Sequence, residues 1–226
     1  MNSIAIAPKR PRPSTRQLRR QLDILAAARE KLTEKGYDGV TMEALAERAG
    51  VVKKTLYNLY GSKDDLLMAA IAEIIDGYRG QAATAERGIP AIIASRRAAS
   101  RQIVATPEYA EAMTKALVQA DPAHRLVRVL LGDSLASHIA HLEVARANDE
   151  LEPGVDVPEL AEQLTSQGWG LILLWMKGLV PLAEFESRSL RGMIVVLLAV
   201  TRGARRRELQ DLLNQTTLPQ RGGQGS

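Results

Sequence analysis

Five polar side chains lie close together in one short stretch of the chain, and each carries a group that can contact DNA. They are Lys53, Lys54, Thr55, Tyr57 and Asn58. A lysine ammonium can bind a phosphate or a guanine, an asparagine amide can pair with adenine, and a threonine methyl can contact thymine. Presented together on one helix, these side chains could read a DNA sequence.

The surrounding residues predict the helices that would present them. Thr41 caps a short helix over residues 42–49, a tight turn follows at Gly50, and a second short helix covers residues 52–59. The small and apolar residues of the inner faces are Leu45, Ala46, Val51, Leu56 and Leu59. This pattern is typical of a helix-turn-helix at about residues 40–59, although a plain helical hairpin also fits it.

The basic charge of the chain is confined to its first quarter. Residues 1–63 hold 13 Lys and Arg against 6 Asp and Glu, whereas residues 64–226 hold 17 against 20. The net charges are therefore +7 and −3, which give the +4 of the whole chain. A localised positive block attracts a polyanion, either a nucleic acid or an anionic membrane surface.

Both ends of the sequence are expected to lack regular structure. Residues 1–13 interleave prolines with basic residues, and proline at that density prevents a helix. This basic arm either aids solubility or lies along DNA phosphates or in a minor groove. Residues 214–226 end in a glycine-rich stretch that cannot pack, so we expect a disordered tail there.

Elsewhere the apolar residues follow helical periodicity. The first helix begins at Ser14, whose spacing to Gln17 is that of a capping box, and ends at Gly36. A second capping-type start at Ser62 opens a long helix. Proline and glycine boundaries predict further helices over residues 90–104, 107–119, 123–148, 157–179 and 187–213. No strand pattern of useful length and no internal repeat occurs, so we predict an all-α fold.

Residues 24–70 carry a specific set of motifs. These are Glu34-Lys35-Gly36-Tyr37, Thr41, Ala46-Glu47-Arg48-Ala49-Gly50-Val51, Thr55-Leu56-Tyr57 and Tyr60-Gly61-Ser62-Lys63-Asp64-Asp65-Leu66. With them the segment closely resembles the amino-terminal domain of the TetR/AcrR family of transcriptional regulators. The sequence departs from that family at Val52, where a serine usually caps the recognition helix, and at Lys54, where glycine is common. Because valine cannot accept from free N–H groups, the helix is expected to use another partner or to fray.

The resemblance implies a three-helix DNA-binding domain over residues 14–62, followed by a larger effector-binding and dimerisation domain over residues 63–213. It implies phosphate contacts from Thr41, Tyr57 and Lys63. It implies base or backbone contacts from Lys53, Lys54, Thr55 and Asn58. Two of these residues have a structural alternative, since Tyr57 could pack between the first and third helices and Lys63 could be a solvated charge.

Two apolar helices near the end of the chain suit a dimer-forming four-helix bundle. Their apolar faces carry Leu160, Leu164, Gly168, Leu171, Ile172 and Trp175, and Leu190, Met193, Ile194, Leu197, Leu198 and Thr201. The alternative is that these faces fill the core of one subunit. Because a helix-turn-helix protein uses two copies to read a two-fold site, we expect a homodimer.

Candidate ligand-binding residues lie on the middle helices. They are Met113, His138, His141, Trp169, Trp175 and Met176. The methionines and tryptophans could line an apolar cavity or pack in the core, and the two histidines are close enough to share a polar ligand. We predict no metal site and no cofactor. A further helix carries Arg96, Arg97 and Arg101 without nearby acids, and these either meet an anionic ligand or face water.

These features predict a sequence-specific regulator, a dimeric repressor that a small-molecule effector releases from a palindromic operator in double-stranded DNA. The alternatives are a non-specific nucleic-acid or membrane-surface binder and an all-α small-molecule-binding protein. The sequence has no cysteine, no phosphate-binding glycine loop and no His-Glu-x-x-His motif, so we expect no enzyme. No apolar run approaches the roughly 18–20 residues of a membrane span, and no signal peptide is evident, so we expect a cytoplasmic protein.

Overall fold

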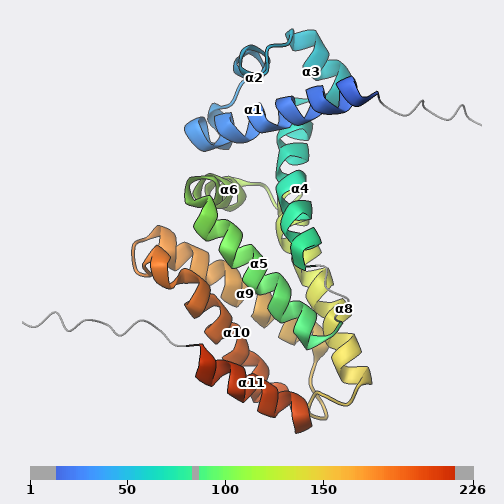
Figure 1. Cartoon of the computed structure of the whole chain (residues 1–226), viewed down its shortest axis with the longest axis vertical. Coiled ribbons are helices and arrows are strands. Elements are labelled where there is room, and N and C mark those ends of the chain that lie inside the picture. Colours follow the sequence, from blue (N-terminus) through green and yellow to red (C-terminus); the bar gives the residue numbers. More distant parts are fainter. Residues whose placement is uncertain (1–13, 83–86, 217–226) are drawn as a thin grey trace, which may run out of the picture.

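The computed structural model describes residues 14–82 and 87–216, so the predicted arm over residues 1–13 and most of the tail predicted over residues 214–226 lie outside it. The start of that tail was predicted wrongly, because α11 continues as a helix to Gln215. Within these ranges regular structure is helical apart from one bridge between Leu151 and Thr201, which confirms the all-α prediction (Figure 1). The elements are α1 (Thr15–Gly39), α2 (Met42–Arg48), α3 (Lys53–Tyr60), α4 (Lys63–Ala82), α5 (Ile89–Ala105), α6 (Pro107–Gln119), α7 (Arg125–Val127), the π-helix η1 (Arg128–Gly132), α8 (Asp133–Ala147), α9 (Val157–Met176), the 3-10 helix η2 (Leu182–Glu184), α10 (Phe185–Val200) and α11 (Gly203–Gln215).

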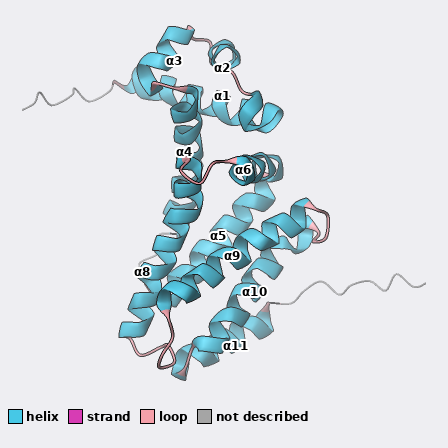
Figure 2. Ribbon diagram, turned by 180° about the vertical axis from the view of Figure 1, so that it is seen from behind, coloured by secondary structure: helices cyan, strands magenta, loops and turns pink. Residues whose placement is uncertain are grey.

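Helices α1 to α3 form a head at one end of the molecule, and α4 leads from it into a body made of α5 to α11 (Figures 1 and 2). In the head, Leu45 of α2 and Leu56 of α3 pack against Ile24 of α1 and against Leu66 and Leu67 of α4. All five side chains are buried, and each burial stabilises the head by about 1.5–3 kcal/mol relative to exposure. The first half of α4 therefore completes the core of the head.

The start of α1 follows the predicted capping box. The Ser14 hydroxyl accepts from the Gln17 N–H at 3.3 Å, and the Gln17 side chain accepts from the Ser14 N–H at 2.7 Å. The predicted end at Gly36 is a kink instead, because Gly36 has φ 68 and the helix resumes as far as Gly39. A positive φ of this kind is accessible to glycine without a Cβ clash.

Head and body meet in a shared apolar cluster. Leu32 of α1 and Met68 and Ile71 of α4 pack with Met113 of α6 and Leu126 of α7. These residues are buried, so a shift of α6 or α7 cannot occur without repacking against α1 and α4.

Two helices that were predicted to be continuous are interrupted in the structure. The segment 123–148 is divided into α7, the π-helical turn η1 and α8, and the segment 187–213 is interrupted between α10 and α11. At the second break Thr201 is extended, with φ −101 and ψ 156, and the Arg202 N–H donates to the Glu150 carbonyl at 2.9 Å. Gly203 then turns the chain with φ 62. The apolar periodicity runs across this break, so the sequence pattern did not reveal it.

The apolar faces expected to join two subunits lie instead in the body's own core. Leu160, Leu164, Met193, Ile194 and Leu197 are buried together in one cluster with residues of α5 and α8. The alternative interpretation of these faces is therefore correct for the described subunit. Exposed apolar side chains occur on other positions of the same region, and they are Leu173, Leu174, Leu179 and Val195.

Candidate nucleic-acid interface and ligand cavity

Helix α3 presents most of the predicted DNA-contacting residues on its outer surface. Lys53, Lys54 and Asn58 are exposed, and the Tyr57 side chain is 45% exposed. Tyr57 is therefore not packed between α1 and α3. Thr55 is half-buried. The buried Leu56 fixes the rotation of α3 about its axis, because it fills the core of the head between these outward-facing positions.

The Lys53 ammonium has two neighbours within the head. It forms an ion pair with the Glu43 carboxylate of α2 and lies 5.9 Å from the centroid of the Tyr57 ring. The hydrogen bond to Glu43 raises the pKa of Lys53, and the same bond lowers the pKa of Glu43. Lys53 must therefore leave this carboxylate, or share it, to reach a phosphate or a base.

The other two predicted phosphate contacts differ in their surroundings. Thr41 is exposed and caps α2, since its hydroxyl accepts from the Ala44 N–H at 3.2 Å. Lys63 is half-buried and donates to the Tyr37 carbonyl at 3.4 Å, with its ammonium 5.7 Å from the Tyr37 ring centroid. Lys63 is therefore held at the junction of α1 and α4, and it is not simply a solvated charge.

The start of α3 lacks a side-chain cap, as the sequence predicts. Val52 occupies the N-cap position with φ −80 and ψ 145, and it makes no side-chain cap hydrogen bond. Its side chain is 69% exposed, so it contributes little to the core. The first N–H groups of α3 consequently lack a side-chain acceptor of the kind that Thr41 supplies to α2.

A cavity of about 240 Å³ lies between the helices of the body and α4. Its walls come from α4, α5, α6, η1, α8, α9 and α10, and are mainly apolar. Four of the predicted ligand residues, Met113, His138, His141 and Trp169, line it. Trp175 and Met176 do not; Trp175 packs edge-on against Phe185 with ring centroids 5.9 Å apart.

His138 is fixed in one tautomer by its partner. The Thr165 hydroxyl donates its hydrogen to the Ala161 carbonyl at 2.8 Å, so the His138 Nδ1–H donates to the Thr165 oxygen at 3.0 Å. Nε2 is then an acceptor. Burial, together with the charge of Arg96 and of His141, lowers the pKa of His138 to about 4. The imidazole is therefore neutral at physiological pH.

The described residues contain no group of three or more His, Asp or Glu side chains placed to hold a metal ion. The two histidines are polar groups of the cavity wall. Among the helices that the structure describes, none is long and apolar enough to cross a membrane.

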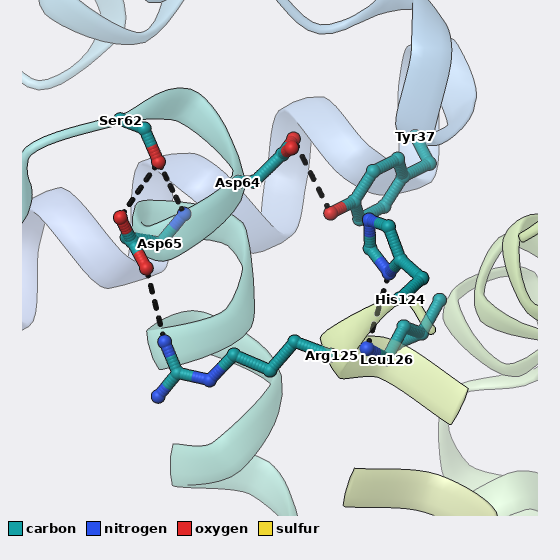
Figure 3. A network of polar contacts seen from close by, with 7 residues as sticks. All are labelled: Tyr37, Ser62, Asp64, Asp65, His124, Arg125 and Leu126. Atoms are coloured by element: carbon teal, nitrogen blue, oxygen red, sulfur yellow. Dashed lines mark hydrogen bonds and ion pairs between the residues drawn. The ribbon is translucent and has the colours of Figure 1, made fainter. Parts of the chain in front are cut away.

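One continuous segment connects the cavity wall to the head. Val129 and Leu130 of η1 line the cavity. In α7, immediately before η1, the Arg125 guanidinium contacts the Asp65 carboxylate at 3.0 Å (Figure 3). Asp65 lies in the first turn of α4. The segment therefore contacts the chain just after α3.

A second contact of this segment involves the end of α1. The His124 ring meets the Tyr37 ring edge-on, with centroids 5.7 Å apart, and His124 Nδ1 accepts from the Leu126 N–H at 3.1 Å (Figure 3). The Tyr37 hydroxyl donates to the Asp64 carboxylate at 3.4 Å, and burial together with that carboxylate raises the pKa of Tyr37. Tyr37 consequently joins α1, α4 and α7.

The cavity includes residues that the sequence did not single out. Tyr109, Thr165 and Gln102 are polar members of its wall, and Arg96 is the arginine of the α5 set that lines it. Their signal is weak in sequence because the wall is assembled from helices far apart along the chain. The Arg96–Arg97–Arg101 pattern pointed to the right helix without selecting the residue.

Comparison with known proteins gives one consistent family. The model described as "Bacterial regulatory proteins, tetR family" matches residues 24–70. The "HTH-type transcriptional repressor KstR" of Mycolicibacterium smegmatis is 30% identical over 187 residues, which span 78% of this chain and 86% of that protein. The protein of the same name from Rhodococcus jostii is 31% identical over 166 residues, which span 72% of this chain and 76% of that protein. Among solved structures, SmeT, the repressor of the Stenotrophomonas maltophilia multidrug efflux pump SmeDEF, superposes with a TM-score of 0.67 at 19% identity, covering 81% of this chain and 91% of that one.

Proposed function

The chain belongs to the TetR family of bacterial regulatory proteins, and we propose that it is a homodimeric repressor which a small molecule releases from its DNA operator. It is a DNA-binding transcriptional regulator. The observation that carries the rest of the proposal is the continuity of η1, which lines the cavity, with α7, which contacts the start of α4. A ligand that displaces η1 acts directly on the helix that follows the recognition helix.

In the proposed complex, α3 lies in the major groove. Lys53, Lys54, Thr55 and Asn58 contact bases or the adjacent backbone, and Tyr57, Thr41 and Lys63 contact phosphates. The exposure of most of these side chains supports this assignment. Lys63 must rearrange to reach a phosphate, because its ammonium donates to the Tyr37 carbonyl.

The second subunit is proposed to cover the exposed apolar residues on α9, on the loop after it and on α10. These are Leu173, Leu174, Leu179 and Val195. Such side chains lose contact with water when two copies associate, which favours a dimer. Leu174→Glu should give monomers by size-exclusion chromatography with light scattering. Val118→Glu, which alters an exposed apolar residue of α6, is the matched control and should remain dimeric.

Release requires only a modest free-energy coupling. If the ligand binds more tightly to a conformation in which the two heads no longer fit successive major grooves, a coupling of about 1–3 kcal/mol lowers operator affinity roughly 5- to 150-fold. The cavity has a binding role in this proposal and no catalytic one. The place of action is the bacterial cytoplasm, where the operator DNA lies.

The test is selection of random duplex DNA by the purified protein, followed by sequencing of the bound pool. An enriched palindrome with half-sites about one helical turn or more apart is expected. An unenriched pool with strongly salt-dependent binding would support instead a non-specific grip on phosphates by the basic segment.

The recognition helix is tested separately with the selected operator. Tyr57→Ala should abolish specific binding, whereas removal of residues 1–13 should weaken binding while leaving the choice of site largely intact. Normal operator binding by Tyr57→Ala would show that α3 has been assigned wrongly. Loss of most affinity on removal of the arm would favour the non-specific alternative.

A further inference from the structure

The wall of the cavity has an unbalanced charge. Among the described residues that line it, Arg96 is charged at neutral pH, and no aspartate or glutamate is present. The two histidines are neutral there, because burial lowers the pKa of His138 and of His141. Burial also lowers the pKa of Arg96 to about 10, which still leaves the guanidinium charged. An apolar cavity with one uncompensated cation is costly to maintain when empty.

Arg96 has few partners for a group of its hydrogen-bonding capacity. One of its terminal N–H groups donates to the Leu164 carbonyl of α9 at 2.6 Å. In the described part of the chain, no carboxylate forms an ion pair with it. A guanidinium has five N–H donors in a planar fork, so most of them have no acceptor among the described residues and can bind a molecule in the cavity.

The neighbouring arginines of α5, Arg97 and Arg101, do not line this cavity. Arg101 pairs with Glu186 of α10 at 3.0 Å, and Arg97 lines a separate pocket together with Arg205 and Glu208 of α11. Of the three arginines that the sequence offered for an anionic ligand, Arg96 is thus the one whose side chain enters the cavity wall.

Gly168 provides the space that Arg96 occupies. A Cβ added to Gly168 would lie 2.9 Å from the Arg96 Cζ and closer still to one terminal nitrogen. Any other residue at this position would push the guanidinium away from α9. A glycine inside a helix costs about 1 kcal/mol relative to alanine, so α9 is weakened at the point where it receives the arginine.

We propose that the ligand of this cavity is a monocarboxylate with an apolar body, and that its carboxylate pairs with Arg96. This inference rests on the proposed function of the cavity as the effector site. A carboxylate matches the fork of a guanidinium with two parallel hydrogen bonds. Ile92, Met113 and Trp169 supply apolar walls for the remainder of the molecule.

A phosphate monoester fits the site less well. It carries about −1.5 to −2 charges at neutral pH, whereas the cavity supplies a single positive charge. The surplus negative charge would be buried without a partner. A monocarboxylate leaves the cavity neutral overall.

The test uses matched pairs of compounds that differ only in charge at one end. Decanoate, 4-phenylbutanoate and 1-naphthylacetate are each compared with the corresponding carboxamide by titration calorimetry on the full-length protein. The acids are expected to bind about ten- to a hundredfold more tightly than their amides, as is typical of a hydrogen-bonded ion pair. Equal or tighter binding of the amides would overturn the carboxylate assignment while leaving the cavity as a binding site. No binding by any compound would also overturn it, and operator binding, measured separately, would be unaffected by that result.

Variants of Arg96 distinguish a ligand-binding role from a structural one. Arg96→Met should remove the preference for acids, Arg96→Lys should retain part of it, and Arg97→Met should leave it unchanged. Because a desolvated cation is removed, Arg96→Met should unfold in urea at the same concentration as the wild type or at a higher one. If Arg96 only braces α5 against α9, Arg96→Met should instead be destabilised and keep the preference, which would overturn the proposal.

Discussion

The Arg125 guanidinium lies 3.0 Å from the Asp65 carboxylate and thereby joins α7 of the body to the first turn of α4. Both side chains are about half exposed, at 55% and 49%, so solvent screens their attraction. Such a pair contributes only about 0–1 kcal/mol to stability. The position of the pair is what links it to the proposed function, because Asp65 closely follows α3, the proposed recognition helix, and Arg125 lies just before the cavity wall.

Loss of this contact should weaken the coupling between ligand binding and operator binding more than it lowers the free energy of unfolding. In Arg125→Ala the midpoint of urea unfolding should shift by less than the equivalent of about 1 kcal/mol. The ratio of operator affinities without and with a releasing ligand should fall several-fold, as measured by fluorescence anisotropy of labelled operator. Arg146→Ala removes an exposed ion pair with Glu143 inside α8 and should leave that ratio unchanged. An unchanged ratio in Arg125→Ala would show that coupling takes another route.

Removal of the Glu43 carboxylate should strengthen operator binding. In the free protein Glu43 holds the Lys53 ammonium, and its own negative charge repels phosphates. Glu43→Gln should tighten binding about two- to tenfold at low salt, with a smaller gain at high salt. Glu111→Gln, on α6, makes the same change in net charge and serves as the control. Equal gains in both variants would indicate a general charge effect rather than release of Lys53.

Val52→Ser should stabilise the head. Val52 already has the extended backbone of an N-cap residue, and its exposed side chain contributes little to the core. A serine hydroxyl can accept from the free N–H groups of α3, which is worth about 0.5–2 kcal/mol. Urea unfolding of the purified variant measures this gain. Val52→Ala, which cannot accept a hydrogen bond, should show no comparable increase; a similar increase there would rule out capping as the cause.

His138 should make the protein less stable in mild acid. An unfolded histidine titrates near a pKa of about 6.5, whereas burial and Arg96 lower the pKa of His138 to about 4 in the folded chain. Between these values the unfolded state binds more protons. The stability present above pH 6.5 is therefore lost progressively as the pH falls toward 4, by about 1 kcal/mol at pH 5.5.

The variant His138→Gln isolates this contribution, because its amide can still donate to Thr165. The difference in unfolding free energy between pH 7.5 and pH 5.5 should be smaller in His138→Gln than in the wild type. His141→Gln is measured for comparison, because burial also lowers the pKa of His141 and its own contribution to the pH dependence must be known. Identical pH dependence in wild type and His138→Gln would show that His138 titrates normally.

Much of the head could be predicted because its determinants are local, although Leu59, which was expected on an inner face, is 43% exposed. The capping residues Ser14 and Thr41, the turn at Gly50 and the buried Leu56 act within a few residues of their partners or follow helical spacing. The missing cap at Val52 was equally visible, since a cap depends on one side chain and the next turn of helix.

The cavity and the continuity of the later helices were decided by tertiary contacts. The sequence offered Trp169 and Trp175 equally as candidates for a ligand cavity. Packing decided between them, because Trp169 lines the cavity and Trp175 packs against Phe185. Apolar periodicity likewise ran through Thr201, where pairing with Leu151 ends α10. Spacing along one helix reports which face is apolar, but not what covers that face.

The sequence by itself thus determined an all-α chain with a helix-turn-helix and its exposed basic and polar side chains. The tertiary structure alone selected Arg96 from three arginines, because only Arg96 lies against Gly168 of a helix far along the chain. Helix formation and capping depend on hydrogen bonds between near neighbours in sequence. A cavity depends on how distant helices pack, and that arrangement is fixed only when the whole core forms.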